Sequence, residues 1–168
     1  MKVLLCLTLL SVAVVMDIRS FQISNRLIVS GILIGCFFQI QELGVKGAGV
    51  FLISVSVPVI LFYLLFLMRA LGAGDIKLFS MIGGIWGLQV LCTTIAVSFL
   101  AAAVMSLGKI LFHKNLILRL RVFRGYMREV LTSGRLLKYP QEFQGGQHII
   151  HFSIAILIGY AIAMEVVY

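Results

Sequence analysis

Long apolar runs, separated by short polar segments, make up most of this chain. A helix needs about 20 apolar residues to cross a bilayer, and about 17 can suffice. With glycine, proline and polar clusters taken as boundaries, the pattern predicts an all-α, polytopic membrane bundle of about six transmembrane helices. The predicted spans are about Lys2–Met16, Arg26–Ile40, Ala48–Met68, Asp75–Leu88, Val90–Phe112 and Ile149–Val167.

Two of these assignments need a further argument. The stretch Leu78–Phe112 is too long for one crossing, and its Gly87-Leu88-Gln89 break favours a hairpin of two helices. The first run could be a secretory signal peptide, but no small-residue cleavage site ends it, and Asp17 follows directly. We therefore expect the first run to be a retained span.

Residues 113–147 form the only long polar stretch of the sequence. Read as a helix over Asn115–Leu131, it has an apolar stripe beside a stripe of arginines, which is typical of a helix lying in the membrane interface. A solvated charged linker is the alternative. We expect one membrane-embedded domain over 1–168, with 113–147 as a basic, amphipathic, cytoplasmic loop.

Composition supports a membrane protein, because 61% of the residues are hydrophobic and only 12% are charged, against about 25% charged in soluble domains. The net charge of +8 comes from Lys and Arg beside apolar runs. This placement indicates anionic lipid headgroups as partners rather than nucleic acid. Cys6, Cys36 and Cys92 stand alone, so we expect buried hydrophobic roles, with no disulfide and no metal site.

Basic residues also predict the orientation of the chain, since they gather in cytoplasmic loops. The side opposite the basic loops holds only Lys2 and Lys46. We therefore expect the loops after the first, third and fifth spans in the cytoplasm and both termini outside. Those loops hold Arg19 and Arg26; Arg69 and Lys77; and Lys114, Arg119, Arg121, Arg124, Arg128, Arg135 and Lys138.

Acidic residues are scarce, with six Asp and Glu in 168 residues. Asp17 closes the first predicted span and Asp75 opens the fourth, so both are expected at the cytoplasmic boundary. Two adjacent carboxylates do not both ionise readily, so one keeps a proton while the other serves as a base. Such a pair can hydrolyse a peptide bond with an activated water. Alternatively, Asp75 only caps a helix and Asp17 only anchors at the interface.

Four nearby residues are candidates for shaping this site. We expect Gly72 and Gly74 to permit unusual backbone angles and to let a substrate strand approach Asp75. Lys77 either extends to the interface or contacts the substrate backbone. Asn25 either hydrogen-bonds near Asp17 or forms a turn.

Two of these segments resemble the motifs of the GxGD aspartyl proteases, specifically the type IV prepilin peptidase family. The first motif reads Asp17 followed by Ile23-Ser24-Asn25, and the second reads Gly72-Ala73-Gly74-Asp75-Ile76-Lys77-Leu78 with Gly83-Gly84 following. The chain departs from the family pattern at Ser24, where Pro is usual, and at His151-Phe152-Ser153, where Pro-Phe is common. His113, His148 and His151 show no metal-ligand spacing.

The resemblance implies an integral-membrane aspartic endopeptidase with Asp17 and Asp75 as catalytic residues and no cofactor. Such an enzyme removes the short basic leader from prepilin-like precursors at the cytoplasmic face of the inner membrane. The compact form is similar to enzymes that serve tight-adherence pili. Because no paired-cysteine segment precedes Asp17, we expect cleavage without N-methylation. The oligomeric state is left open.

Three alternatives stay open from the sequence. A presenilin or signal-peptide-peptidase type of protease shares the second motif, but it places its partner aspartate after Tyr, whereas Met16 precedes Asp17 here. A small proton-coupled transporter could use the acids as a relay, although acids deep in several spans would then be expected. A nonenzymatic assembly scaffold would leave the second motif unexplained.

Overall fold

The computed structural model describes residues 1–68, 70–112 and 151–167, and all regular secondary structure in these ranges is helical. This confirms the predicted all-α class and, for these ranges, the six helices. The predicted Asn115–Leu131 helix and the rest of 113–147 lie outside the described residues. The helices are α1 (Lys2–Ser20), α2 (Asn25–Leu43), α3 (Val45–Leu67), α4 (Ala73–Trp86), α5 (Leu88–Phe112) and α7 (Phe152–Val167).

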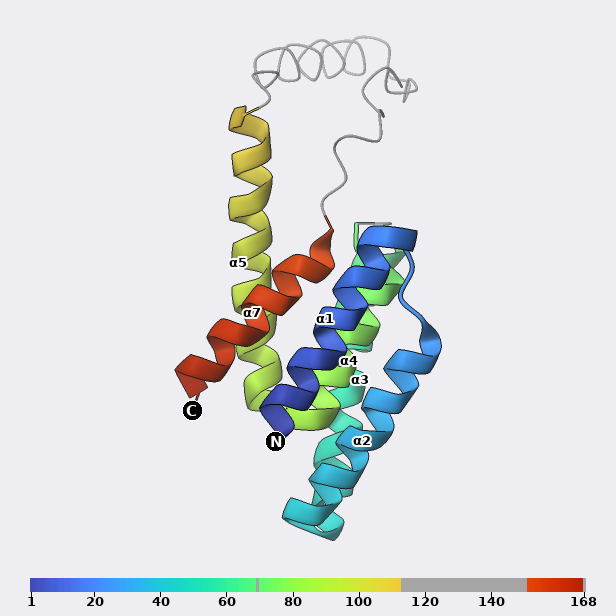
Figure 1. Ribbon diagram of the computed structural model, residues 1–168. Coiled ribbons are helices and arrows are strands. Elements are labelled where there is room, and N and C mark those ends of the chain that lie inside the picture. Colours follow the sequence, from blue (N-terminus) through green and yellow to red (C-terminus); the bar gives the residue numbers. More distant parts are fainter. Residues whose placement is uncertain (69, 113–150, 168) are drawn as a thin grey trace, which may run out of the picture. The chain divides into compact units, whose positions relative to one another are not determined.

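The chain divides into two compact units, one of Met1–Ala102 with His151–Tyr168 and the other of Ala103–Ile150. The first unit contains α1 to α4, the first part of α5, and α7 (Figure 1). In the second unit, the structure describes only the end of α5. The expectation of a single domain over the whole chain stays a prediction, and the candidate site described below lies in the first unit.

Local sequence signals explain where the helices begin and end. The Ser24 hydroxyl accepts the backbone N–H of Arg26 at 3.3 Å and so caps the start of α2. Helices α2 and α4 end at Gly44 and Gly87, whose φ angles of 58° and 83° favour glycine. Helix α1 ends at Phe21, which has a φ of 54° although it is not glycine. The chain reverses direction between successive helices from α1 to α4 (Figure 1).

Four of the described helices are long and apolar enough to cross a membrane: α1, α2, α3 and the segment Leu88–Lys109 of α5. Many of their outward positions carry large apolar side chains; Ile60 is 75% exposed and Leu4 is 70% exposed. A surface this apolar suits contact with hydrocarbon, where helices satisfy their own backbone groups. The chain is therefore a membrane protein, as predicted.

Helix α4 is the central helix of the first unit. It packs against α1, α2, α3 and α7, and every residue from Leu78 to Ile85 is buried. Its 14 residues measure about 21 Å along the axis, so α4 is shorter than the hydrocarbon core of a bilayer. The predicted element over Asp75–Leu88 is present as a helix, and its neighbours shield it on several sides; whether it crosses the membrane stays a prediction.

Small residues let α4 approach α2 and α3 closely. A methyl group on Gly35 of α2 would lie 2.7 Å from the backbone carbon of Gly84, closer than real contacts allow. Pro58 lies inside α3 and lacks the N–H that would bond the Ser54 carbonyl. That freed carbonyl faces Gly83, where a methyl group would lie 2.5 Å from the oxygen. Close backbone approach at small residues is typical of helix packing in membranes.

The end of the unit where α1 begins is held by a polar contact. The Lys2 amine lies 2.6 Å from a Glu42 carboxylate oxygen and 5.6 Å from the centre of the Trp86 ring. The Trp86 indole N–H donates to the Tyr160 hydroxyl at 3.1 Å. These contacts connect the start of α1 to the ends of α2 and α4, and through Tyr160 to the middle of α7.

The three cysteines do not share the buried environment that we expected. Cys6 is buried, whereas Cys36 is half-buried and Cys92 is exposed on the protein surface. In a membrane helix an exposed position can still be apolar, because lipid rather than water covers it. The buried role is therefore correct for Cys6 and wrong for Cys92.

Candidate active site

Asp17 lies in the last turn of α1, because the helix continues beyond the predicted end at Met16 to Ser20. The backbone N–H of Phe21 donates to the Asp17 carbonyl at 2.9 Å and closes this turn. The Asp17 carboxylate accepts a hydrogen bond from the Ser153 hydroxyl at 2.6 Å and lies 3.2 Å from His151 Nδ1. Both partners come from the beginning of the last helix, more than 130 residues away along the chain.

Asp75 lies in the first turn of α4, outside the four helices that are long enough to span a membrane. Burial and the nearby charge of Asp17 raise the pKa of the Asp75 carboxyl from 3.8 to about 6. A hydrogen bond with the Gly72 backbone lowers this pKa, but by less. Gly72 is the residue before α4, so Asp75 does bond the start of its own helix, as the capping alternative proposed. That role does not conflict with a chemical one.

The two aspartates border the same cavity, which has a volume of about 360 Å³. The structure thus brings together two acids that are 58 residues apart in the sequence. Their common environment fits the expectation that one carboxyl keeps a proton while its neighbour is ionised. The cavity is lined by Asp17, Phe21, Gln22, Ile23, Gly72, Ala73, Gly74, Asp75 and Lys77.

The two glycines beside Asp75 do not have the unusual backbone angles that we predicted. Gly72 has ordinary extended angles (φ −76°, ψ 148°), and Gly74 is part of the α4 helix, so the expectation of unusual backbone angles is wrong. Both glycines have limited space for a side chain. A methyl group on Gly72 would lie 3.1 Å from an Asp75 carboxylate oxygen, and one on Gly74 would lie 3.1 Å from the Ile23 side chain.

Lys77 and Asn25 bond to each other, which neither of our alternatives for these residues anticipated. The Lys77 amine donates to the Asn25 side-chain oxygen at 2.7 Å. Asn25 is the first residue of α2, so this bond joins the start of α2 to the first turns of α4. Because Lys77 also borders the aspartate cavity, the bond fixes one wall of that cavity.

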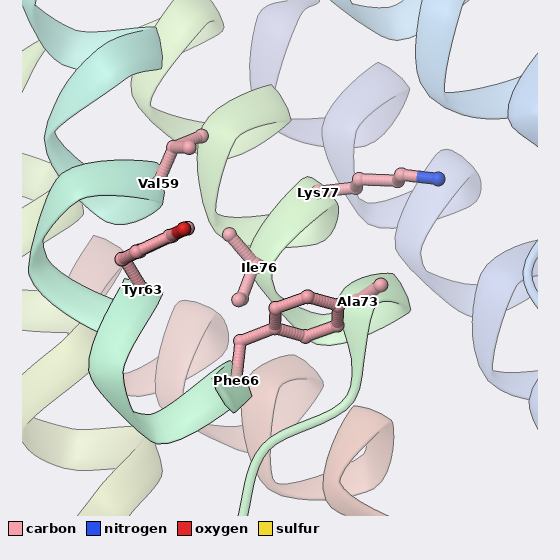
Figure 2. A pocket seen from close by; sticks show the side chains of 6 residues that line it. All are labelled: Val59, Tyr63, Phe66, Ala73, Ile76 and Lys77. Atoms are coloured by element: carbon pink, nitrogen blue, oxygen red, sulfur yellow. The ribbon is translucent and has the colours of Figure 1, made fainter. Parts of the chain in front are cut away.

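A second cavity of about 280 Å³ lies between α3 and α4. Figure 2 shows Val59, Tyr63 and Phe66 around the side chain of Ile76, with Ala73 beside them and the Lys77 amine pointing away. Ala73 and Lys77 line both cavities. A mostly apolar cavity therefore lies next to the one that holds the two carboxylates.

His151 and Ser153 are the residues that sequence reasoning missed at this site. The sequence showed only a departure from a Pro-Phe pattern and a histidine without metal-ligand spacing. Ser, His and Asp are also the components of a serine-protease triad, but their connection differs here. In such a triad the serine hydroxyl bonds the histidine, whereas the Ser153 hydroxyl bonds Asp17 directly. Within the described ranges, no group of three or more His, Cys, Asp or Glu is arranged to hold a metal ion.

Comparison with known proteins places this site in a family. A search of curated proteins and a search of solved structures gave no match. The model of the type IV leader peptidase family matches residues 4–107, a range that includes both aspartates and the Gly-x-Gly-Asp segment and ends before His151 and Ser153. Since this match covers more than half of the 168 residues, the chain belongs to the type IV leader peptidase family.

Proposed function

We propose that this membrane protein is an aspartic endopeptidase that removes the short basic leader from prepilin-like precursors. The observation that carries the proposal is the common cavity of Asp17 and Asp75, in which burial and then the charge of Asp17 raise the pKa of Asp75 to about 6. Two carboxyls in different protonation states are what acid–base hydrolysis of a peptide bond requires.

The reaction needs one water molecule and no group beyond the two carboxyls. The ionised carboxylate takes a proton from water as the water oxygen bonds the peptide carbonyl carbon. The protonated carboxyl gives its proton to the carbonyl oxygen. The C–N bond then breaks as the amine nitrogen receives the proton held by the first carboxyl, and the second carboxyl takes a proton back from the hydroxyl group. Both carboxyls return to their starting states.

The walls of the site suit a substrate that has an apolar segment next to the cleaved bond. The apolar cavity between α3 and α4 shares Ala73 and Lys77 with the aspartate cavity, so an extended peptide could fill both. Prepilin-like precursors, with a basic leader before a long apolar helix, have this character. We place the reaction at the cytoplasmic face of the inner membrane because basic residues concentrate on that side of the predicted topology.

A proton-coupled transporter is less well supported by the arrangement of acids. A relay across the bundle needs ionisable groups along its length. The other acids in the described part of the chain are Glu42 and Glu165, and neither borders the aspartate cavity. Glu42 instead pairs with Lys2.

Co-expression with a prepilin-like precursor tests the proposal through the gel shift that leader removal produces. We expect Asp17→Asn and Asp75→Asn each to abolish processing, because Asn keeps the size of Asp but cannot cycle a proton. Glu165→Gln is the matched control, since Glu165 is exposed near the end of α7, and it should process normally. Substantial processing by either aspartate variant would refute the proposal.

A further inference from the structure

The two aspartates have different hydrogen-bond partners. Asp17 Oδ2 lies within bonding distance of two side chains, the Ser153 hydroxyl at 2.6 Å and His151 Nδ1 at 3.2 Å. Asp75 instead bonds the Gly72 backbone and is raised in pKa by burial. Donors that bond a carboxylate favour its ionised form, whereas burial favours its protonated form. The groups that bond Asp17 are therefore side chains at the start of the last helix, whereas the group that bonds Asp75 belongs to the backbone at the start of its own helix.

The Ser153 contact has the length of a bond to a charged acceptor. A hydroxyl that donates to an ionised carboxylate typically lies 2.5–2.7 Å away, closer than in a neutral pair, and the 2.6 Å separation from Asp17 falls in this range. A serine hydroxyl can donate to a carboxylate in any rotamer that reaches it. His151 can donate from Nδ1 in its neutral Nδ1–H form or as the imidazolium.

The placement of His151 is maintained at a cost to the backbone. Its ring stacks on the Phe21 ring, with centroids 5.2 Å apart and planes 22° from parallel. Phe21 adopts a φ of 54°, a left-handed backbone angle that is unusual for a bulky residue. This left-handed turn ends α1 and also directs the Phe21 ring against the imidazole. Such strain is typical of sites where a side chain must be held in place.

We propose that His151 and Ser153 are positioning residues that hold Asp17 ionised, so that Asp17 is the base and Asp75 is the acid of the pair. This assignment rests on the proposed peptidase function. Among the described residues both side chains bond Oδ2, which leaves Oδ1 as the oxygen that takes the proton from water. The Asp75 carboxyl then donates its proton to the peptide carbonyl oxygen.

Few other ionisable groups in the described residues face Asp17. Asp75 and Lys77 on α4 border its cavity, and His151 contacts it from the start of the last helix. Lys77 bonds Asn25, and the negative charge of an ionised Asp75 would oppose ionisation of Asp17. Ser153 and His151 are therefore the groups whose removal should alter the ionisation of Asp17 most directly.

The experiment uses the fact that Asp17 and Asp75 are the only aspartates in the sequence. The full chain is made in detergent micelles with ¹³C at the aspartate side-chain carboxyl, so a carbon NMR titration reports this pair alone. Asp17→Asn and Asp75→Asn assign the two signals. In the wild-type protein we expect the Asp17 signal to show ionisation at lower pH than the Asp75 signal.

Two variants remove one donor each. His151→Phe keeps a ring to stack on Phe21 but has no Nδ1, and Ser153→Ala has no hydroxyl. Each should move the Asp17 transition to higher pH by about one unit, the usual effect of one hydrogen bond to a charged group. His151→Asn and Ser153→Thr each keep a donor. In these variants the Asp17 transition should return to its wild-type pH. Ser20→Ala is the control, since the Ser20 hydroxyl donates only to the Met16 and Gln22 carbonyls.

Leader-removal kinetics provide the second measurement, with a synthetic precursor that has a lysine-rich leader, a glycine and about 20 apolar residues. His151→Phe and Ser153→Ala should lower kcat about tenfold at acidic pH with little change in KM, and the conservative variants should recover it.

The inference is overturned if Asp75 ionises before Asp17, or if both donor variants keep the wild-type transition. Inactive Asp17→Asn and Asp75→Asn variants would in that case leave the proposed function standing. Processing by those variants would instead refute the function, whatever the titration shows. The two donor variants are independent, so if one fails to fold, the other still decides the question.

Discussion

At the scale of single residues, the site depends on a buried acid that is kept partly protonated. Asp75 has a pKa raised to about 6 by burial and by the charge of Asp17. A group whose pKa is higher in the folded chain than in the unfolded one contributes stability at low pH, and this stability is lost as the pH rises through the folded value. Asp75 should therefore destabilise the fold at neutral pH, where it is ionised.

We accordingly expect Asp75→Asn to raise the melting temperature at neutral pH while it removes activity. The gain should be on the order of 1–3 kcal/mol, because each unit of pKa shift corresponds to about 1.4 kcal/mol. It should disappear below about pH 4, where Asp75 is protonated in both states. Thermal unfolding of the wild-type protein and of Asp75→Asn in detergent, at neutral pH and below about pH 4, measures the difference in melting temperature. An equal effect of Asn at both pH values would contradict the assigned environment.

The residues at this site were predicted from the sequence to different degrees. Asp17 and Asp75 stood out because acids are scarce in this chain. Asp17 follows an apolar run, and Asp75 precedes one. His151 and Ser153 were missed because their role depends on a contact between α1 and α7, across more than 130 residues. Gly72 and Gly74 were identified, but the tight space around them was not, since the space around a Cβ depends on neighbours that the motif does not contain.

At the scale of helices, α4 is held in the centre of its unit by residues without side chains. Gly35 of α2 and Gly83 of α4 each lie where a methyl group would meet backbone atoms of a neighbouring helix. Gly49 of α3 has no atom within 4 Å of the same position. The three positions therefore separate the effect of packing from the intrinsic preference of helices for alanine.

Gly35→Ala and Gly83→Ala should each destabilise the protein by about 1–3 kcal/mol, the usual cost of overpacking. Gly49→Ala should instead stabilise it slightly, because alanine favours helices by about 1 kcal/mol over glycine. Melting temperatures of the three variants in the same detergent provide the comparison. If Gly83→Ala were as stable as Gly49→Ala, the close approach of Gly83 to the Ser54 carbonyl would be wrong.

The helices themselves were largely predictable, and their ends were not. Apolar runs and glycine breaks predicted all six, because a membrane helix must satisfy its backbone groups internally over its whole length. Asp17 and Arg19 suggested an end to α1 at Met16, but the helix continues until Phe21 turns into the left-handed region. The shortness of α4 was visible in the sequence, whereas its enclosure by four neighbours was not.

At the scale of the whole molecule, the orientation in the membrane decides which precursors the site can reach. The C-terminal end of α1 and the N-terminal ends of α4 and α7 meet at Asp17 and Asp75. Basic residues predict this side to be cytoplasmic. Val45, at the beginning of α3, is 93% exposed and lies in the loop that the prediction puts outside.

Cysteine labelling tests this orientation in a variant whose Cys6, Cys36 and Cys92 are replaced. A membrane-impermeant reagent should label Val45→Cys in intact cells and Ser20→Cys only after the membrane is opened. The variant that lacks all three native cysteines and carries no new one is the background control. Labelling of Ser20→Cys in intact cells would reverse the proposed topology and remove the argument for leader cleavage in the cytoplasm.

The pH dependence of kcat/KM for leader removal by the purified wild-type protein tests the central claim, that two carboxyls in different protonation states hydrolyse the peptide bond. A carboxyl base and a carboxyl acid give a bell-shaped profile. Because Asp75 must keep its proton and its pKa is raised to about 6, we expect the activity to fall tenfold for each pH unit above about 6. Activity that rises through neutral pH to a plateau, as a nucleophile activated by histidine would give, would contradict the account.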